Sequence, residues 1–176
     1  MGIKADFRQS DIFKQLVEAK TRIEAGIMKV MKYTGEEFVK NARENVTQSV
    51  YKRAVFDKDG KKRVREAWEL TGNLRSSIGY FILKDGTEIS SSIGNIPEDT
   101  ETGKEAIRTM IRDLSKKQAG YFLVGVAGMN YASNVESYGY DVITNAKGVA
   151  LVNLNQRWKD LEKHFEGNKI GDFSVI

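Results

Sequence analysis

Residues 10–51 read SDIFKQLVEAKTRIEAGIMKVMKYTGEEFVKNARENVTQSVY, and this stretch decides the fold of the chain. Its apolar residues recur at spacings of three, four and seven, which places side chains on one slowly drifting face of an α-helix. They are Ile12, Leu16, Ile23, Ile27, Val30, Met31, Phe38, Ala42 and Val46. The pattern predicts a long amphipathic helix that Ser10 or Asp11 can cap. Glycine weakens a helix interior by about 1 kcal/mol relative to alanine, so we expect a bend or break near Gly35.

Shorter elements follow this helix. The turn sequence Lys84-Asp85-Gly86-Thr87 separates two runs of strand-forming residues, which predicts a β-hairpin. The predicted order begins with the long helix at 10–51, the hairpin at 76–93 and a short helix at 102–116. A strand at 121–126, a helical turn at 131–137, a strand at 140–144 and an amphipathic helix at 151–166 follow. This order predicts an α+β fold, with the long N-terminal helix packed on a small, mostly antiparallel sheet and an amphipathic helix at the C-terminus.

The last predicted helix has the most regular apolar spacing in the chain. Leu151, Leu154, Trp158, Leu161 and Phe165 follow one another at alternating spacings of three and four residues. Side chains at this spacing share one side of a helix, so we expect these five to form its apolar face.

We expect residues 1–176 to form a single domain, because a chain of 176 residues can bury one substantial core. Two appendages are expected on it. One is a basic hairpin or loop at residues 52–68, and the other is a C-terminal tail at residues 167–176. The tail begins at the glycine that is expected to cap the last helix. It contains Phe173, Val175 and Ile176, and an apolar tail of this kind often docks on its own subunit or on a neighbour.

The positive charge of the chain is concentrated in one short segment. The net charge is +4, and residues 52–65 hold seven basic and two acidic residues. Asp59-Gly60 is a hairpin signal, so we interpret the segment as a basic, mobile hairpin or loop. One interpretation is a solvated loop, and the other is a contact with DNA or with an acidic protein partner. The residues predicted for such a contact are Lys61, Lys62, Arg63 and Arg65.

The composition excludes several kinds of catalytic site. The chain has no cysteine and a single histidine, His164, which excludes thiolate nucleophiles, disulfides and Cys- or His-rich metal sites within one chain. No motif for catalysis or for cofactor binding is complete, so we expect no enzymatic activity, no metal and no cofactor. No apolar run reaches the roughly 20 residues of a membrane helix, and the first ten residues lack a signal-peptide pattern. We therefore expect the chain to stay in the cytoplasm in which it is made.

Glu136 is the carboxylate with the most apolar and aromatic sequence neighbourhood. An ion pair with an arginine, for example Arg75, is the favoured interpretation, because structural ion pairs are a common outcome in such a setting. A catalytic role for Glu136 is the less favoured alternative.

Two segments carry a family resemblance. Residues 70–80 read LTGNLRSSIGY, and residues 131–142 read YASNVESYGYDV. Together they resemble the tail-component family that siphophages encode in the head–tail joining module, also called tail-completion, tail-terminator or neck proteins. The family pattern is an N-terminal helix, "TG.LR.SI" entering a strand, "YA..VE.GY" after a later strand, and a C-terminal helix. The matching positions are Thr71, Gly72, Leu74, Arg75, Ser77, Ile78, Tyr131, Ala132, Glu136 and Gly139.

The resemblance spans roughly residues 10–166, with two departures. Trp68-Glu69 stands where the family often has a proline, and the basic segment and the predicted helix at 102–116 make the chain longer than the simplest members. The motif residues also have local roles that follow from their chemistry. Glycine at position 72 lets the chain turn sharply into a strand, and Gly139 permits a tight reversal. Leu74 and Ile78 are expected in the core, whereas Arg75 and Ser77 are expected to face other ways.

The resemblance implies a structural virion protein of a tailed phage. Such a protein is made in the host cytoplasm and becomes part of the head–tail connector or tail-terminator ring around the DNA channel. The implied partners are further copies of the chain, the portal-side connector proteins, the tail-tube proteins and DNA in the channel. A terminator position implies a hexamer, and a position nearer the portal implies a dodecamer. The alternatives from other classes are a nucleic-acid-binding module that uses the basic segment, and a hydrolase with an unrecognised site.

Overall fold

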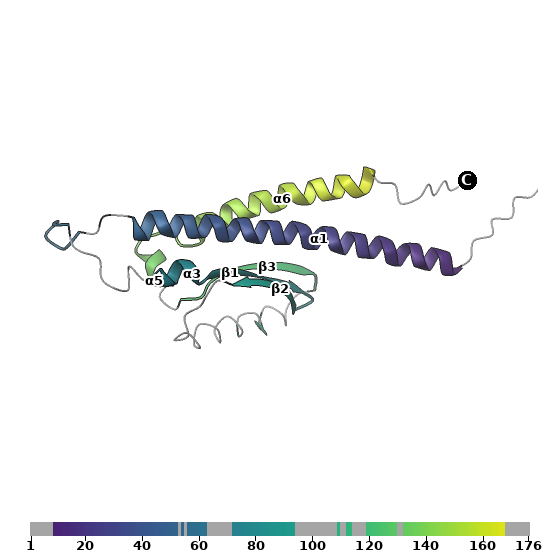
Figure 1. Cartoon of the computed structure of the whole chain (residues 1–176), viewed down its shortest axis with the longest axis horizontal. Coiled ribbons are helices and arrows are strands. Elements are labelled where there is room, and N and C mark those ends of the chain that lie inside the picture. The colour runs from purple at the N-terminus through teal and green to yellow at the C-terminus, as the bar shows by residue number, and fades with distance from the viewer. Residues whose placement is uncertain are drawn as a thin grey trace, which may run out of the picture.

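The chain forms an elongated α+β structure, as the sequence predicts, in which a long helix lies against a small sheet (Figure 1). The computed structural model describes residues 9–52, 54, 56–62, 72–93, 109, 112–113, 119–129 and 132–167. The elements in chain order are α1 Gln9–Val46, η1 Thr47–Tyr51, α3 Asn73–Ser76, β1 Ile78–Lys84, β2 Thr87–Ile93, β3 Tyr121–Ala127, α5 Ala132–Ser137 and α6 Thr144–Gly167.

The expected bend near Gly35 is wrong, because α1 is one helix of 38 residues that runs through this position. The helical register changes instead at η1, a π-helical turn that ends at Tyr51. Gly35 is needed for close packing: a Cβ atom placed there would lie 2.6 Å from Cδ2 of Tyr80. The glycine therefore lets β1 approach α1 closely.

The sheet has three antiparallel strands in the order β2-β1-β3. The turn between β1 and β2 consists of Asp85 and Gly86, which have φ values of 48° and 79°, as a tight hairpin turn of this kind requires. Central strand β1 is buried on both faces. Its residues Ile78, Tyr80 and Ile82 join the main core beneath α1, whereas Phe81 and Leu83 join a second cluster on the opposite face.

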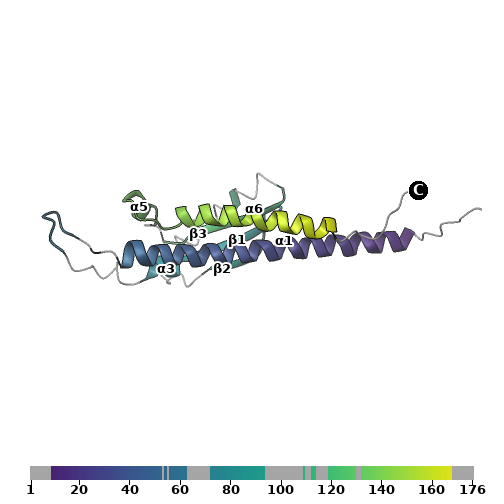
Figure 2. The same cartoon turned by 90° about the horizontal axis from the view of Figure 1, so that it is seen from above.

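Helix α6 lies beside α1 over much of its length (Figure 2). Its contact face differs from the predicted apolar face. Ala146 and Ala150 are buried, whereas Leu151 and Trp158 are 50% and 37% exposed. Arg157 lies in the contact face instead and bonds to α1. The predicted face is therefore wrong in part: Leu161 and Phe165 do lie against α1, at Gly26, whereas Leu151 and Trp158 do not lie in the buried contact.

The strand predicted at residues 140–144 is also wrong. Residues 140–143 form an irregular connector, and Thr144 begins α6. The amides of Ile143 and Thr144 donate hydrogen bonds to Glu136 Oε1, and the amide of Asn145 donates to Asp141 Oδ1. These backbone donors are satisfied by carboxylate side chains at the start of a helix, which leaves them unavailable for strand pairing.

The hairpin predicted in the basic segment is present where the structure describes it. Phe56 pairs with Lys62 in an antiparallel bridge, and Gly60 has a φ of 76°.

Most of the helix predicted at residues 102–116 and nearly all of the tail at 167–176 lie outside the described residues, as do Arg63 and Arg65.

Candidate functional site

The two motif segments meet at one end of the molecule, where α1 ends and α3 and α5 lie (Figure 1). Leu74 and Ile78 of the first segment belong to the same core cluster as Ala132 and Val135 of the second. Leu74 is 1% exposed and Ile78 is fully buried, as predicted. The amide of Gly128, just before the second segment, donates to the Ser77 carbonyl at 3.1 Å. Thr71 and Tyr131 of the matching positions lie outside the described residues.

The first segment enters the sheet through a helical turn, which the sequence did not predict. Gly72 has a φ of 70° and precedes α3, so its turn leads into α3 and only then into β1. Arg75 is exposed, as expected. Ser77 is fully buried, contrary to expectation, and its hydroxyl donates to the Leu74 carbonyl at 2.8 Å. The helical turn ends at Ser77, so strand alternation does not yet govern the direction of this side chain.

Glu136 caps α6 and does not pair with Arg75, so the favoured interpretation of its partner is wrong. Its Oε1 accepts hydrogen bonds from the amide of Ile143 at 2.9 Å and from the amide and hydroxyl of Thr144 at 3.1 and 3.0 Å. Burial disfavours the charged form, but these bonds and one from the Val142 amide outweigh it and lower the pKa of Glu136. A charged cap at a helix N-terminus stabilises the start of α6.

Gly139 makes the reversal that follows α5, as predicted. Its φ is 80°, in the left-handed region that glycine enters without strain. Its amide donates to the Glu136 carbonyl at 2.9 Å. The second motif segment therefore builds the corner that turns the chain from α5 towards α6.

Tyr80 forms a polar contact that the sequence did not reveal. Its hydroxyl donates to Glu36 Oε1 at 2.9 Å, and its side chain is 3% exposed. Burial, together with the hydrogen bond and the negative charge of Glu36, raises the pKa of Tyr80 to about 12. The hydroxyl is therefore protonated at neutral pH and fixes the position of the central strand beneath α1.

The basic hairpin protrudes beyond the end of the helical body (Figure 1). Its described lysines Lys58, Lys61 and Lys62 are exposed. Asp57 Oδ1 accepts hydrogen bonds from the amides of Asp59 and Lys61, at 2.9 and 2.7 Å, which holds the turn in shape. The hairpin therefore presents lysine side chains to solvent on a turn that these hydrogen bonds close.

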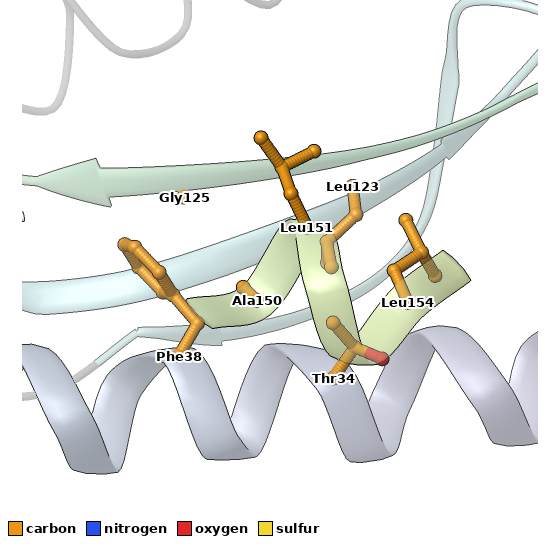
Figure 3. Close-up of a pocket in the computed structure, with 7 residues that line it drawn as sticks. All are labelled: Thr34, Phe38, Leu123, Gly125, Ala150, Leu151 and Leu154. Atoms are coloured by element: carbon orange, nitrogen blue, oxygen red, sulfur yellow. The ribbon is translucent and has the colours of Figure 1, made fainter. Parts of the chain in front are cut away.

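An apolar groove lies between α1, α6 and β3 (Figure 3). It is lined by Thr34, Phe38, Leu123, Gly125, Ala150, Leu151 and Leu154, and we call it the α6–β3 groove. Trp158 lies one helical turn beyond Leu154 on α6 and is 37% exposed. Residues four apart share one side of a helix, so this indole lies on the same side of α6 as Leu154. An apolar groove with an exposed aromatic side chain nearby is the kind of surface that binds protein partners.

A second apolar surface lies on the N-terminal part of α1, which extends past the end of α6 (Figure 1). Its exposed side chains are Ile12, Phe13, Leu16, Val17 and Ile23. Phe13 and Leu16 are 70% and 63% exposed. Side chains of this size on a helix usually have a partner.

Within the described ranges, no three acidic or histidine side chains come close enough together to hold a metal ion. Over the same residues, no helix combines the length and apolarity that crossing a bilayer requires. No family model, curated protein or solved structure matches the chain.

Proposed function

We propose that the protein is a structural subunit of a tailed-phage neck, in the head–tail connector or tail-terminator ring. The observation that carries the proposal is the apolar α6–β3 groove, with Trp158 exposed one helical turn beyond it on α6. The resemblance of residues 70–80 and 131–142 to neck proteins supplies the biological setting. In this proposal the groove receives a different surface of the next copy.

A contact between two different surfaces that repeats by rotation closes into a ring, whereas a self-complementary contact would stop at a dimer. A concave groove cannot fill itself, so the proposed contact joins it to a different surface of the next copy, which is the first kind of contact. A six-fold ring is proposed by analogy with siphophage tails, and a twelve-fold ring would accompany a position nearer the portal. Portal-side and tail-tube proteins are the proposed neighbours in the virion.

The test combines imaging with two substitutions. Purified protein is imaged by electron microscopy, alone and with the proteins of neighbouring genes, and the subunit is located in the virion. Rings around the channel axis are expected. Leu151→Asp and Trp158→Asp should each prevent ring formation, whereas Asn155→Asp on the same helix should not, because Asn155 does not line the groove. Isolated copies on the capsid surface, with no ring on the axis, would refute the proposal.

The basic hairpin favours a second candidate function, nucleic-acid binding. Lys58, Lys61 and Lys62 are exposed on a turn that protrudes from the body. Lysines in this arrangement bind phosphates without sequence preference. Within a neck ring the same hairpin would face DNA in the channel or an acidic neighbouring protein.

A further inference from the structure

We propose that residues 168–176 dock in cis on the N-terminal part of α1, where they continue the contact that α6 makes with this helix. The bound segment is the C-terminal tail of the same chain. The surface that receives it consists of Ile12, Leu16, Ala19 and Ile23, which we call the N-terminal stripe.

The N-terminal stripe is an uninterrupted extension of the α1–α6 contact. On α1, Thr34 and Glu37 bond to α6, and a Cβ on Gly26 would lie 2.8 Å from Cδ1 of Leu161 and 3.3 Å from Cζ of Phe165. Continuing towards the N-terminus from Gly26 at spacings of three and four leads to the four stripe residues. Positions at this spacing share one side of a helix, so the side of α1 that binds α6 remains apolar beyond the last turn of α6.

The stripe is exposed where α6 stops. Helix α6 ends at Gly167, two residues after Phe165 contacts the Gly26 position, whereas α1 runs on to Gln9. Beyond this point Leu16 is 63% exposed, and Ile12 and Ile23 are 39% and 37% exposed. The apolar contact between the two helices is therefore incomplete at its N-terminal end.

The tail has the length to complete it. At a rise of 1.5 Å per residue, Ile12 lies about 21 Å along α1 from Gly26. An extended chain spans about 3.3 Å per residue, so residues 168–176 reach roughly 30 Å beyond the end of α6. Since α6 runs antiparallel to α1, the chain leaves Gly167 beside Gly26 and at the edge of the stripe.

The tail also has the composition to complete the contact. It reads NKIGDFSVI, in which Ile170, Phe173, Val175 and Ile176 are apolar. A segment tethered next to its site has a high effective concentration there, which favours the tail of the same chain over a segment from another molecule. Docking would bury apolar surface on both segments with a short closing loop, so little chain entropy opposes it.

The test uses the absence of native cysteine, which makes an introduced cysteine pair the sole thiols in the full chain. The test variant is Ala19→Cys with Ser174→Cys, which leaves the large apolar residues of the stripe and the tail in place. The control is Thr21→Cys with Ser174→Cys. Thr21 is exposed and lies two residues from Ala19, on the opposite side of α1, at a nearly equal distance along the helix. A disulfide forms only when the two Cα atoms approach to within about 7 Å.

Under mild oxidation, the Ala19 pair is expected to form an intrachain disulfide with a yield roughly tenfold above that of the Thr21 pair, because the tail is held on one side of α1. Non-reducing electrophoresis and mass spectrometry of the monomer fraction measure this yield. Equal yields from the two pairs would overturn the proposal. Predominant interchain dimers of the Ala19 pair would overturn it as well, because the tail would then bind another copy.

A second measurement does not depend on cysteine chemistry. Phe173→Ser with Ile176→Ser removes two apolar tail residues and should raise the fluorescence of an apolar dye such as ANS by roughly twofold through uncovering the stripe. Lys169→Ser with Asp172→Ser is the control and should not change it. Unchanged fluorescence in the first variant, with the helical circular dichroism of the parent retained, would also refute docking in cis. These results are independent of ring formation, because both are measured on the monomer.

Discussion

Nη2 of Arg157 lies 2.7 Å from Oε2 of Glu37, in an ion pair that joins the middle of α6 to α1. Nη1 of the same arginine lies 3.1 Å from the Thr34 hydroxyl, and Asn153 donates to Glu37 Oε1 at 2.8 Å. Glu37 therefore accepts bonds from two residues one helical turn apart on α6. This network explains why a polar side chain occupies a position between two helices.

The ion pair predicts that removing the charge of Glu37 destabilises the protein. Glu37→Gln should lower the free energy of unfolding by roughly 1 kcal/mol, because the pair is about two-thirds buried and the amide weakens both bonds. Glu44→Gln is the control, since Glu44 is exposed on the same helix. Urea unfolding at neutral pH measures the difference, and equal midpoints for the two variants would contradict the assignment.

The same carboxylate predicts a pH dependence. The hydrogen bond from Arg157 is the main cause that lowers the pKa of Glu37 below the usual value, against the opposing effect of burial. A carboxylate with a lowered pKa in the folded state stabilises the fold above its unfolded pKa, and this contribution is lost as the pH falls through the folded pKa. Between neutral pH and a pH below about 4, the parent should therefore lose more stability than Glu37→Gln does. Parallel unfolding curves for the two proteins across this range would disprove the linkage.

The cap on α6 predicts a larger effect at Glu136. Glu136→Ala leaves the amides of Ile143 and Thr144 without their acceptor, so we expect a loss of roughly 1–2 kcal/mol. Glu136→Gln keeps one acceptor oxygen and should lose less. The control is Glu162→Ala, at an exposed position within α6. Thermal unfolding followed by circular dichroism ranks the three variants, and a Glu136→Ala midpoint equal to that of Glu162→Ala would rule out the capping role.

Two glycines in helices should respond to alanine in opposite directions. A Cβ at Gly35 would lie 2.6 Å from the buried ring of Tyr80, so Gly35→Ala should destabilise the protein by roughly 1–3 kcal/mol. A Cβ at Gly148 would meet no atom within 4 Å, so Gly148→Ala should stabilise α6 by up to about 1 kcal/mol. Urea unfolding of both variants tests the packing. A higher free energy of unfolding for Gly35→Ala would show that Tyr80 of β1 does not pack closely against α1 at this position.

The exposed lysines of the basic hairpin predict a salt-dependent interaction if their partner is DNA. Lys61→Gln with Lys62→Gln should weaken binding to duplex DNA and reduce the slope of log affinity against log salt by about 2, since each phosphate contact contributes about 0.9. Lys159→Gln with Lys163→Gln, on exposed positions of α6, is the matched control. Fluorescence anisotropy at several salt concentrations measures the slope. Identical slopes for both variants would exclude the hairpin as the DNA contact.

The periodic parts of the fold could be predicted from the sequence. The apolar spacing of residues 10–51 gives the long helix because core-facing side chains repeat with the helical period. The Asp85-Gly86 turn gives the hairpin because few dipeptides accept two positive φ values. The burial of Leu74 and Ile78 could also be predicted from the residues next to them in the sequence.

Features that depend on distant contacts could not be predicted in this way. Gly35 alone indicates a weak point in a helix, and only the position of Tyr80 shows that it permits close packing. The fully buried Ser77 depends on where α3 ends. The apolar spacing of α6 favoured Leu151 and Trp158 as buried residues, because a sequence pattern does not include the bonds of Arg157 to α1.

Some features of the candidate surfaces could likewise be predicted from the sequence, and others could not. The exposed lysines at 61 and 62 and the apolar excess of α1 could be inferred from composition and spacing. The α6–β3 groove could not, because its walls come from three elements far apart in the chain. Glu136 was identified as unusual from its neighbours, but its role as a cap required the position of the Thr144 amide.

The sheet order β2-β1-β3 has a consequence for the time course of folding. Strands β1 and β2 are joined by two residues and can pair locally, whereas the pairing of Tyr80 with Gly125 must close a loop of 44 intervening residues. Pairing across this separation costs more chain entropy than pairing within the hairpin, so β3 is expected to join the sheet after β1 and β2 have paired. During synthesis, one edge of the apolar strand β1 stays unpaired until residues 121–127 have left the ribosome. That interval is when a nascent chain of this protein is most exposed to wrong strand pairing and aggregation.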